Sequence, residues 1–229
     1  MAQNSSDIEL VMLTIDDYEE VAQLYGEQFL KRNPLAKVCK ETTLKDQGES
    51  LVKELRRTLD SGLSIGVRDK TTKVLVGFRL SAIFHVDKTS TCYVGDENEP
   101  SKTYRMLARY SPFGKEIKDL GVTTVLELNA VCVHKDYCRR GIAAMMIKVI
   151  VHKTLELVVE RGCQLAAVQT ANSLSEKIYN RLNFRTIKIL DLYTVADEFG
   201  LDTSIIPGET ILRLMVKRLP SKTTSNPPE

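Results

Sequence analysis

The run from residue 123 to residue 162 constrains the fold more than any other part of this 229-residue chain. It starts with TTVLELNAVCVH (123–134), whose β-branched residues predict a strand. It continues through KDYCRRG into apolar residues at helical spacing, and Gly162 is a suitable residue after the end of a helix. A strand that leads through a basic, glycine-containing loop into a long helix predicts a sheet covered by helices.

The rest of the chain mixes strand and helix patterns in a similar way. Further strands are predicted at 7–14, 63–69, 73–86, 163–170, 185–194 and 209–219. Further helices are predicted at 16–32, 44–59, within 101–119 and at 173–184. Thr14 or Asp16 is the expected cap of the first helix, Asn33–Pro34 its end, and Ser173 the cap of the last.

These elements predict one domain of the α/β (α+β) class, with a mixed central β-sheet flanked by helices, over residues 1–219. The polar stretch at about 87–122 is predicted to be an insertion. The tail 220–229 has low hydrophobicity and is predicted to be disordered.

Charge and cysteine content exclude several classes of function. The net charge of +2 gives no electrostatic footprint for nucleic acid or an anionic membrane. Five scattered cysteines without a CxxC pair argue against a metal site and a disulfide framework, so we expect no metal and reduced thiols. We also expect no signal peptide and no membrane span, hence a cytoplasmic protein without nucleic-acid or membrane partners.

The loop HKDYCRRG has the chemistry of a local anion site. A helix N-terminus presents unpaired backbone N–H groups and partial positive charge, and Gly141 lets a ligand approach the backbone. Arg139 and Arg140 add cationic donors that suit a phosphate or pyrophosphate. From these residues alone, a solvent-exposed basic turn is an equally good interpretation.

A family resemblance favours the anion site. ELNAVCVHKDYCRRGIAAMMIKVI (127–150) resembles the acetyl-CoA-binding segment of GNAT-type N-acetyltransferases, whose motif is (Gln/Arg)-x-x-Gly-x-(Gly/Ala). The motif falls on Cys138, Arg139, Arg140, Gly141, Ile142 and Ala143. Gly141 and Ala143 match it, whereas Cys138 departs from the usual residue. The resemblance implies that backbone N–H groups of this loop hold the pyrophosphate.

A second segment, ANSLSEKIYNRLNF (171–184), resembles N-x-x-A-x-x-x-Y-x-x-x-G-F of the same family. Asn172, Tyr179 and Phe184 match, while Ser175 and Asn183 stand where alanine and glycine are common. The resemblance covers roughly residues 120–190. It implies a single GNAT-like domain with the CoA cradle between the central strand and the following long helix, and it adds Asn172 to the CoA-binding residues.

Acetyl transfer to an amine requires a base and an acid near the thioester. Glu127 is the candidate base, because it interrupts an apolar strand where burial could raise its pKa, and because the histone-acetyltransferase branch carries its base on this strand. Tyr179 is the candidate acid, because the family places a tyrosine there near the CoA sulfur. The resemblance to transferases that act directly favours structural thiols at Cys132 and Cys138 over nucleophiles.

The strand around Glu127 is also expected to contact the co-substrate. Unless a bulge intervenes, strand alternation puts Glu127 and Asn129 on the same face as Val131 and Val133. The backbone of the segment Val131, Cys132 and Val133 is then expected to pair with the pantetheine arm.

The acceptor is indicated by EQFLKRNPLAKV (27–38), which resembles the segment after the first helix in insect-type arylalkylamine N-acetyltransferases. In that branch a D-E-P-L sequence carries a catalytic glutamate, and Asn33 stands at its position here. Serines on the second motif assist in that branch, and Ser175 matches one of them while Ala171 does not. The resemblance implies an N-acetyltransferase for a small primary amine, with a lean toward arylalkylamines.

Other functions stay open at this point. The acceptor could be a diamine, a polyamine or a protein lysine. The departures at Asn33 and Cys138 also allow a non-catalytic module that binds acyl-CoA, and a structural domain without a CoA site is a third possibility.

Overall fold

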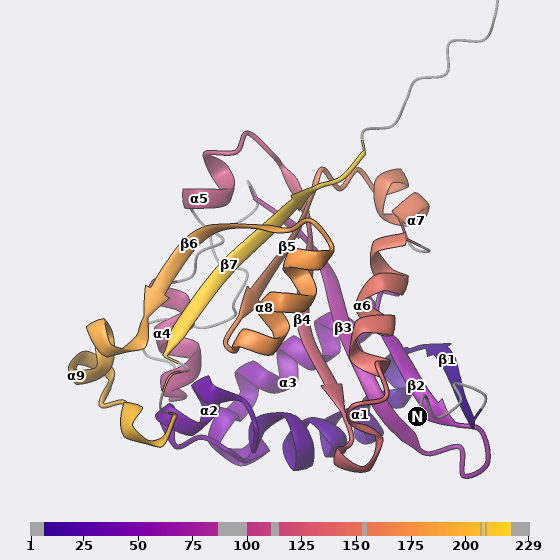
Figure 1. Ribbon diagram of the computed structural model, residues 1–229, viewed down its shortest axis with the longest axis horizontal. Helices are drawn as coiled ribbons and strands as arrows, with labels where there is room; N and C mark the ends of the chain where they lie inside the picture. The colour runs from indigo at the N-terminus through magenta and orange to yellow at the C-terminus, as the bar shows by residue number, and fades with distance from the viewer. Residues whose placement is uncertain are drawn as a thin grey trace, which may run out of the picture.

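The computed structural model describes residues 7–86, 100–110, 115–152, 155–206, 208 and 210–220 (Figure 1). Residues 221–229 of the predicted tail lie outside the described residues, as do 87–99 of the predicted insertion with Cys92. No helix in the described part of the chain is long and apolar enough to cross a membrane.

The centre of the structure is a mixed sheet that has seven strands within the described residues, in the order β1-β2-β3-β4-β5-β7-β6. Strands β4 (Thr124–Val133) and β5 (Leu165–Thr170) pair in parallel, and the other neighbours pair antiparallel. The remaining strands are β1 (Ile8–Met12), β2 (Ile65–Asp69), β3 (Leu75–His85), β6 (Arg185–Asp191) and β7 (Ile211–Arg218). The predicted fold class, a mixed sheet flanked by helices in one domain, is confirmed.

Helical segments between β1 and β2 bury their apolar sides on one face of the sheet, in a core cluster that includes Phe78 and Leu80 of β3. These segments are α1 (Tyr18–Leu24), η3 (Tyr25–Leu30), α2 (Pro34–Cys39) and α3 (Leu44–Asp60), and the short η2 (Ile15–Asp17), which has no buried residue, precedes them. Helix α4 (Lys102–Tyr110) adds Tyr104, Met106 and Leu107 to the same cluster. Part of the stretch predicted to be an insertion therefore belongs to the core.

The first helix differs from the continuous helix predicted at 16–32. Thr14 caps it as predicted, through a capping box with Asp17, but the chain then passes through α1 into the π-helix η3. Asn33 ends the segment as expected, yet Pro34 opens the unpredicted helix α2. The Asn33 side chain accepts a hydrogen bond from the Leu35 N–H at 2.8 Å, and proline at the first helical position lacks only an N–H that would be unpaired.

The opposite face of the sheet carries α6 (Ile142–His152), α7 (Leu155–Glu160) and α8 (Ser173–Arg181). Their buried residues, among them Ile142, Met146 and Tyr179, form a second core cluster with residues of β2, β4 and β5. Residues 153 and 154 of the predicted long helix lie outside the described residues. Asn172, not the predicted Ser173, caps α8: its side chain accepts from the Ser175 N–H at 2.8 Å.

The shorter elements connect these layers. They are α5 (Lys115–Lys118), η4 (Lys135–Tyr137), η5 (Leu192–Val195), α9 (Ala196–Phe199) and η6 (Thr203–Ile205). The strand predicted at 185–194 ends at Asp191, because the Asp191 side chain accepts from the Tyr193 N–H at 3.0 Å and begins η5.

A bulge in β4 changes which side chains share a face. Leu80 of β3 pairs with Ala130 and Ser81 pairs with Leu128, so Asn129 is an extra residue on β4. Val125, Ala130 and Cys132 belong to the cluster under α3, whereas Leu126, Leu128 and Val133 belong to the cluster under α6. The side chains of Glu127 and Asn129 both reach α3, as predicted, but Val131 and Val133 belong to the cluster under α6, so the prediction of a shared face is wrong for these two residues because of the bulge.

Candidate active site

A cavity of about 470 Å³ lies where β4 and β5 separate. The two strands pair only from Val125 with Leu165 to Leu128 with Val168, and both continue beyond this point. Beyond this point the stretches Asn129–Val133 of β4 and Gln169–Thr170 of β5 no longer pair with each other, and both line the cavity. On the side of β4 that faces away from β3, backbone groups of this stretch lack a strand partner, as the predicted contact of Val131, Cys132 and Val133 with a pantetheine arm requires.

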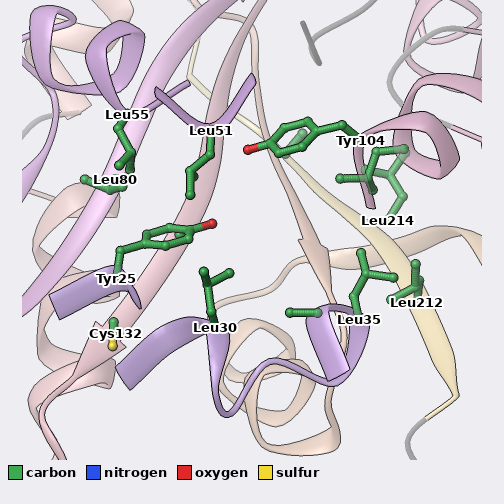
Figure 2. Packing of buried hydrophobic residues seen from close by; sticks show 14 of the residues in the cluster. Tyr25, Leu30, Leu35, Leu51, Leu55, Leu80, Tyr104, Cys132, Leu212 and Leu214 are labelled. Carbon is green, nitrogen blue, oxygen red and sulfur yellow. The ribbon is translucent and has the colours of Figure 1, made fainter. Parts of the chain in front are cut away.

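Apolar side chains from several elements form much of the cavity wall. The lining includes Tyr25, Phe29 and Leu30 of η3, Leu35 of α2, Tyr104 and Leu107 of α4, and Leu212 of β7. Figure 2 shows Tyr25 and Tyr104 reaching from different elements toward the space near Leu30, Leu35 and Leu51. The cavity can therefore take an apolar body.

The predicted pyrophosphate loop has the backbone of an anion site. Arg139 and Gly141 both have positive φ, at 63° and 76°. Gly141 directly precedes α6, whose first N–H groups have no acceptor within the helix. Turns with left-handed residues of this kind direct successive N–H groups to one side and form anion-binding concavities. A Cβ atom on Gly141 would meet nothing within 4 Å, so the space above this backbone is open.

The predicted residues of this loop differ in their surroundings. Cys138 and Ala143 line the cavity, whereas Arg139, Arg140, Gly141 and Ile142 are not among the described lining residues. Arg139 is exposed, and Ile142 is buried in the core under α6. The Arg140 guanidinium forms a 3.3 Å ion pair with Asp7 and stacks over the Tyr137 ring at 4.7 Å, so it is already engaged.

Arg32 connects the two cavity cysteines. Its guanidinium donates to the Val133 carbonyl at 2.6 Å and lies 3.4 Å from the sulfurs of both Cys132 and Cys138. Burial raises the pKa of the Cys132 thiol to about 12, although Arg32 opposes the rise. Cys132 is therefore a neutral thiol at physiological pH, which supports a structural role over a nucleophilic one.

Tyr179 meets a buried arginine in the cavity wall. Both Tyr179 and Arg79 of β3 line the cavity with side chains that are almost fully buried. Within the described part of the chain, the Tyr179 hydroxyl and the Nε and Nη2 atoms of Arg79 have no hydrogen-bond partner. Burial raises the pKa of Tyr179, and the nearby Arg79 guanidinium opposes that rise. Unpaired buried donors are costly, which indicates a binding role for this pair.

Two buried carboxylates share one arginine beside the bulge. Arg57 of α3 donates to Glu54 at 2.6 and 2.9 Å and also to Glu127 of β4. Glu54 accepts a further hydrogen bond from the side chain of Asn129, the bulged residue. Of the two carboxylates, Glu54 is among the described residues that line the cavity, and Glu127 is not. The second oxygen of Glu127 is buried and has no hydrogen-bond partner among the described residues.

The environment of Glu54 raises the pKa of its carboxyl group toward neutral pH. Burial, followed by repulsion from Glu127, raises the pKa of Glu54 to about 7, while Arg57 and Asn129 act in the opposite direction. Burial alone would lower the pKa of Arg57, but the two carboxylates outweigh it and raise that pKa. Arg57 therefore stays charged, and Glu54 is the group of this cluster that is poised to exchange a proton.

The remaining predicted residues lie at the same cavity. Asn172 and Ser175 line it from the start of α8, together with Asn33 from the start of α2. The Asn33 side chain is occupied as a helix cap. Among the described residues, no group of three or more His, Cys, Asp and Glu side chains could hold a metal ion.

Sequence reasoning missed Glu54 and Arg79. A signal was present for each: Glu54 lies on the face of α3 that carries Leu51, Leu55 and Thr58, and Arg79 interrupts the apolar run VLVGFRLSAIF. A charged residue at a core position of an amphipathic element indicates a buried pair or a site.

Comparisons with known proteins agree with this geometry. A family model described as FR47-like protein matches residues 121–192, the part of the chain that carries both motifs. No curated protein sequence matches the chain.

Among solved structures, arylalkylamine N-acetyltransferase 2 from Aedes aegypti has a TM-score of 0.75 at 19% identity, over 94% of this chain and 100% of that one. The polyamine N-acetyltransferase of Drosophila melanogaster, which forms N-acetylagmatine, has a TM-score of 0.73 at 13% identity, over 93% and 100%. NAA60 from Arabidopsis thaliana in complex with acetyl-CoA has a TM-score of 0.54 at 15% identity, over 93% and 98%.

At these identities the structural likeness establishes the fold. The family match and the likeness confirm the GNAT pattern recognised in the sequence, and they support an N-acetyltransferase. The neighbours differ in their acceptors, so the acceptor of this chain has to be inferred from its own cavity.

Replacement of Gly141 by alanine tests the pyrophosphate loop. We expect the affinity for CoA to fall about tenfold or more, because a Cβ would enter the space that a phosphate needs, while strain costs only about 1 kcal/mol of stability. Gly121→Ala is the matched control, because Gly121 also has positive φ (67°) and nothing within 4 Å of its Cβ position. Isothermal titration calorimetry with CoA measures both, and equal losses in the two variants would contradict a binding role for the loop.

Replacement of Glu54 by glutamine tests the electrostatics of the buried cluster through stability. The pKa of Glu54 is about 7 in the folded protein against an ordinary 4.5, so the folded state holds this proton more tightly than the unfolded state. The stabilisation of the folded state by this tighter proton binding is fully present below about pH 4.5 and is lost as the pH rises through 7. The size of the pKa shift corresponds to about 3 kcal/mol of unfolding free energy at most.

The stability of Glu54→Gln relative to wild type should therefore be higher at pH 8 than at pH 5. Urea unfolding at both values of pH measures it. Glu49→Gln, at a 91% exposed side chain on the same helix, is the control and should show no such dependence. A Glu54→Gln effect of equal size at pH 5 and pH 8 would rule out the shifted carboxyl.

Proposed function

We propose that this chain is an acetyl-CoA-dependent N-acetyltransferase that transfers the acetyl group directly to a small primary amine, with an arylalkylamine as acceptor. The observation that carries this proposal is the cavity at the separation of β4 and β5, which combines apolar walls with one carboxylate. The four described cysteines are free thiols, which agrees with a cytoplasmic location as part of the proposal.

The charge of the cavity supports a monoamine. Among the described lining residues, Glu54 is the one carboxylate, whereas Arg32 and Arg79 bring two guanidinium groups. A single ammonium group can pair with Glu54. The second ammonium of a diamine or polyamine would have no anionic partner among these residues, and an unpaired buried charge is costly. An aromatic amine with an apolar body fits the tyrosine and leucine walls better.

The predicted residues have complementary roles in this proposal. Backbone groups of Val131, Cys132 and Val133 bind the pantetheine arm, and a free N–H of this strand polarises the thioester carbonyl. The loop from Cys138 to Ala143 and the first turn of α6 bind the pyrophosphate, and Asn172 contributes from the start of α8.

Tyr179 protonates the CoA thiolate as it leaves. The Arg79 guanidinium supports this role, because it opposes the rise in the pKa of Tyr179 and favours negative charge at the sulfur. Ser175, which also lines the cavity, assists through its hydroxyl. Glu127 as the base stays a prediction from the sequence.

An acceptor screen tests the proposal. Phenylethylamine-type amines, agmatine and spermidine, and a lysine peptide are compared with acetyl-CoA as donor, with release of CoA thiol as the readout. We expect kcat/KM for the aromatic monoamines to exceed that for the polyamines by about tenfold or more. A preference for polyamines or peptide would contradict the acceptor class. CoA binding without turnover on any amine would support the non-catalytic module instead.

Tyr179→Phe tests the acid. We expect kcat to fall about a hundredfold, the lower end of the usual contribution of a general acid, with an unchanged affinity for CoA. The control is Tyr193→Phe, at a 57% exposed tyrosine on η5. Full activity of Tyr179→Phe would remove Tyr179 from the mechanism.

A further inference from the structure

The cluster of Glu54, Arg57 and Glu127 assigns a catalytic role that the sequence motifs do not carry. Given the proposed function, we infer that Glu54 accepts a proton from the acceptor's ammonium group, and that Glu127 is a positioning residue that acts through Glu54. The base would then come from α3, not from the central strand or from the Asn33 position.

Access separates the two carboxylates. The side chain of Glu54 is 5% exposed and lines the cavity, whereas that of Glu127 is 1% exposed and lies outside the described lining. An amine in the cavity can therefore reach Glu54 directly, as proton transfer requires. Arg57 contacts both carboxylates, with two hydrogen bonds to Glu54 and one to Glu127, so access to the cavity, not pairing with Arg57, separates them.

Position relative to the reacting thioester also favours Glu54. Its carboxylate accepts a hydrogen bond from Asn129, the residue at which β4 bulges and beyond which it separates from β5. The unpaired N–H groups proposed to polarise the thioester begin at this point. Asn129 therefore ties the carboxylate to the place where the amine has to attack.

The cation that pairs with Glu54 is shared with a second carboxylate. The groups that interact electrostatically or by hydrogen bonds with Glu54 are Arg57 on the same helix, Asn129 and Glu127 on β4, and Tyr25 on η3. Of these groups, Arg57 is the cation, and it is shared between two carboxylates. The Arg79 guanidinium on β3 interacts electrostatically with Tyr179 and Glu127. The ammonium group of an acceptor would add a second positive charge next to Glu54, beside the shared Arg57.

The proton balance is complete without a further reactant. A primary alkylamine is protonated at neutral pH, as lysine is, and carries three protons on nitrogen. Glu54 takes one, and the freed lone pair attacks the thioester carbon to form the C–N bond. When the C–S bond breaks, the thiolate takes a proton from Tyr179, and the second nitrogen proton restores that hydroxyl. The third proton stays on the amide, and Glu54 releases its proton to water.

Glu127 contributes by repulsion. Together with burial it raises the pKa of Glu54 to about 7, where a general base works best at neutral pH. Removing the negative charge of Glu127 would lower the pKa of Glu54. It would leave the proton acceptor itself in place.

The pH dependence of kcat/KM for the two glutamine variants tests this inference. For the wild type we expect a rising limb near pH 7. Glu54→Gln should lower kcat about a hundredfold or more and remove that limb, with an unchanged affinity for CoA. Glu127→Gln should keep most of kcat at pH 8 and move the limb about one pH unit lower. Glu49→Gln on the same helix is the control and should behave as wild type.

The reverse pattern, with kcat lost in Glu127→Gln and only a shifted limb in Glu54→Gln, would overturn the inference in favour of Glu127. An active wild type whose Glu54→Gln variant keeps its rate would overturn the assignment of Glu54 alone. A folded wild type without turnover on any amine would overturn the proposed function and the inference together. Thermal melting of each variant shows that it is folded.

Discussion

The extra residue of β4 at Asn129 is the constraint on which the site depends. One added residue breaks the register with β3 and exchanges the faces of the residues that follow. At the same point β4 separates from β5, so backbone groups that would have paired in a continuous sheet face a cavity. The Asn129 side chain then holds the carboxylate of Glu54. The backbone groups proposed to polarise the thioester and the carboxylate proposed to accept the proton therefore lie at the same irregularity of the sheet.

The elements with strong local patterns could be predicted from the sequence. The strand from Thr124, the start of α6 and the helix with Tyr179 lie where β-branched residues, apolar spacing and the two motifs placed them. The positive φ of Gly141 also agrees with a loop that needs glycine. Each of these features depends on a few consecutive residues, so it can be predicted from a single sequence.

The features that were missed depend on tertiary contacts. The pairing of β4 with β3 decides which face of the sheet each side chain after Asn129 occupies, and no residue type within the strand indicates a bulge. The role of Glu54 depends on Arg57 and on Glu127, and these two partners are 70 residues apart in sequence. Helix α2 begins at Pro34, a residue that local rules associate with the end of a helix as readily as with its beginning.

The π-helix η3 has a consequence for how the cavity can vary. A π-turn holds one more residue than an α-turn, so the residues after it are rotated by about 100° relative to a regular helix. Tyr25, Phe29 and Leu30 face the cavity from this segment. Deleting one residue here would regularise the helix, while the chain on either side could keep its direction. The side chains within Tyr25–Leu30 would then move by one position relative to the cavity, so the length of this segment, as well as its sequence, decides which side chains form this part of the wall.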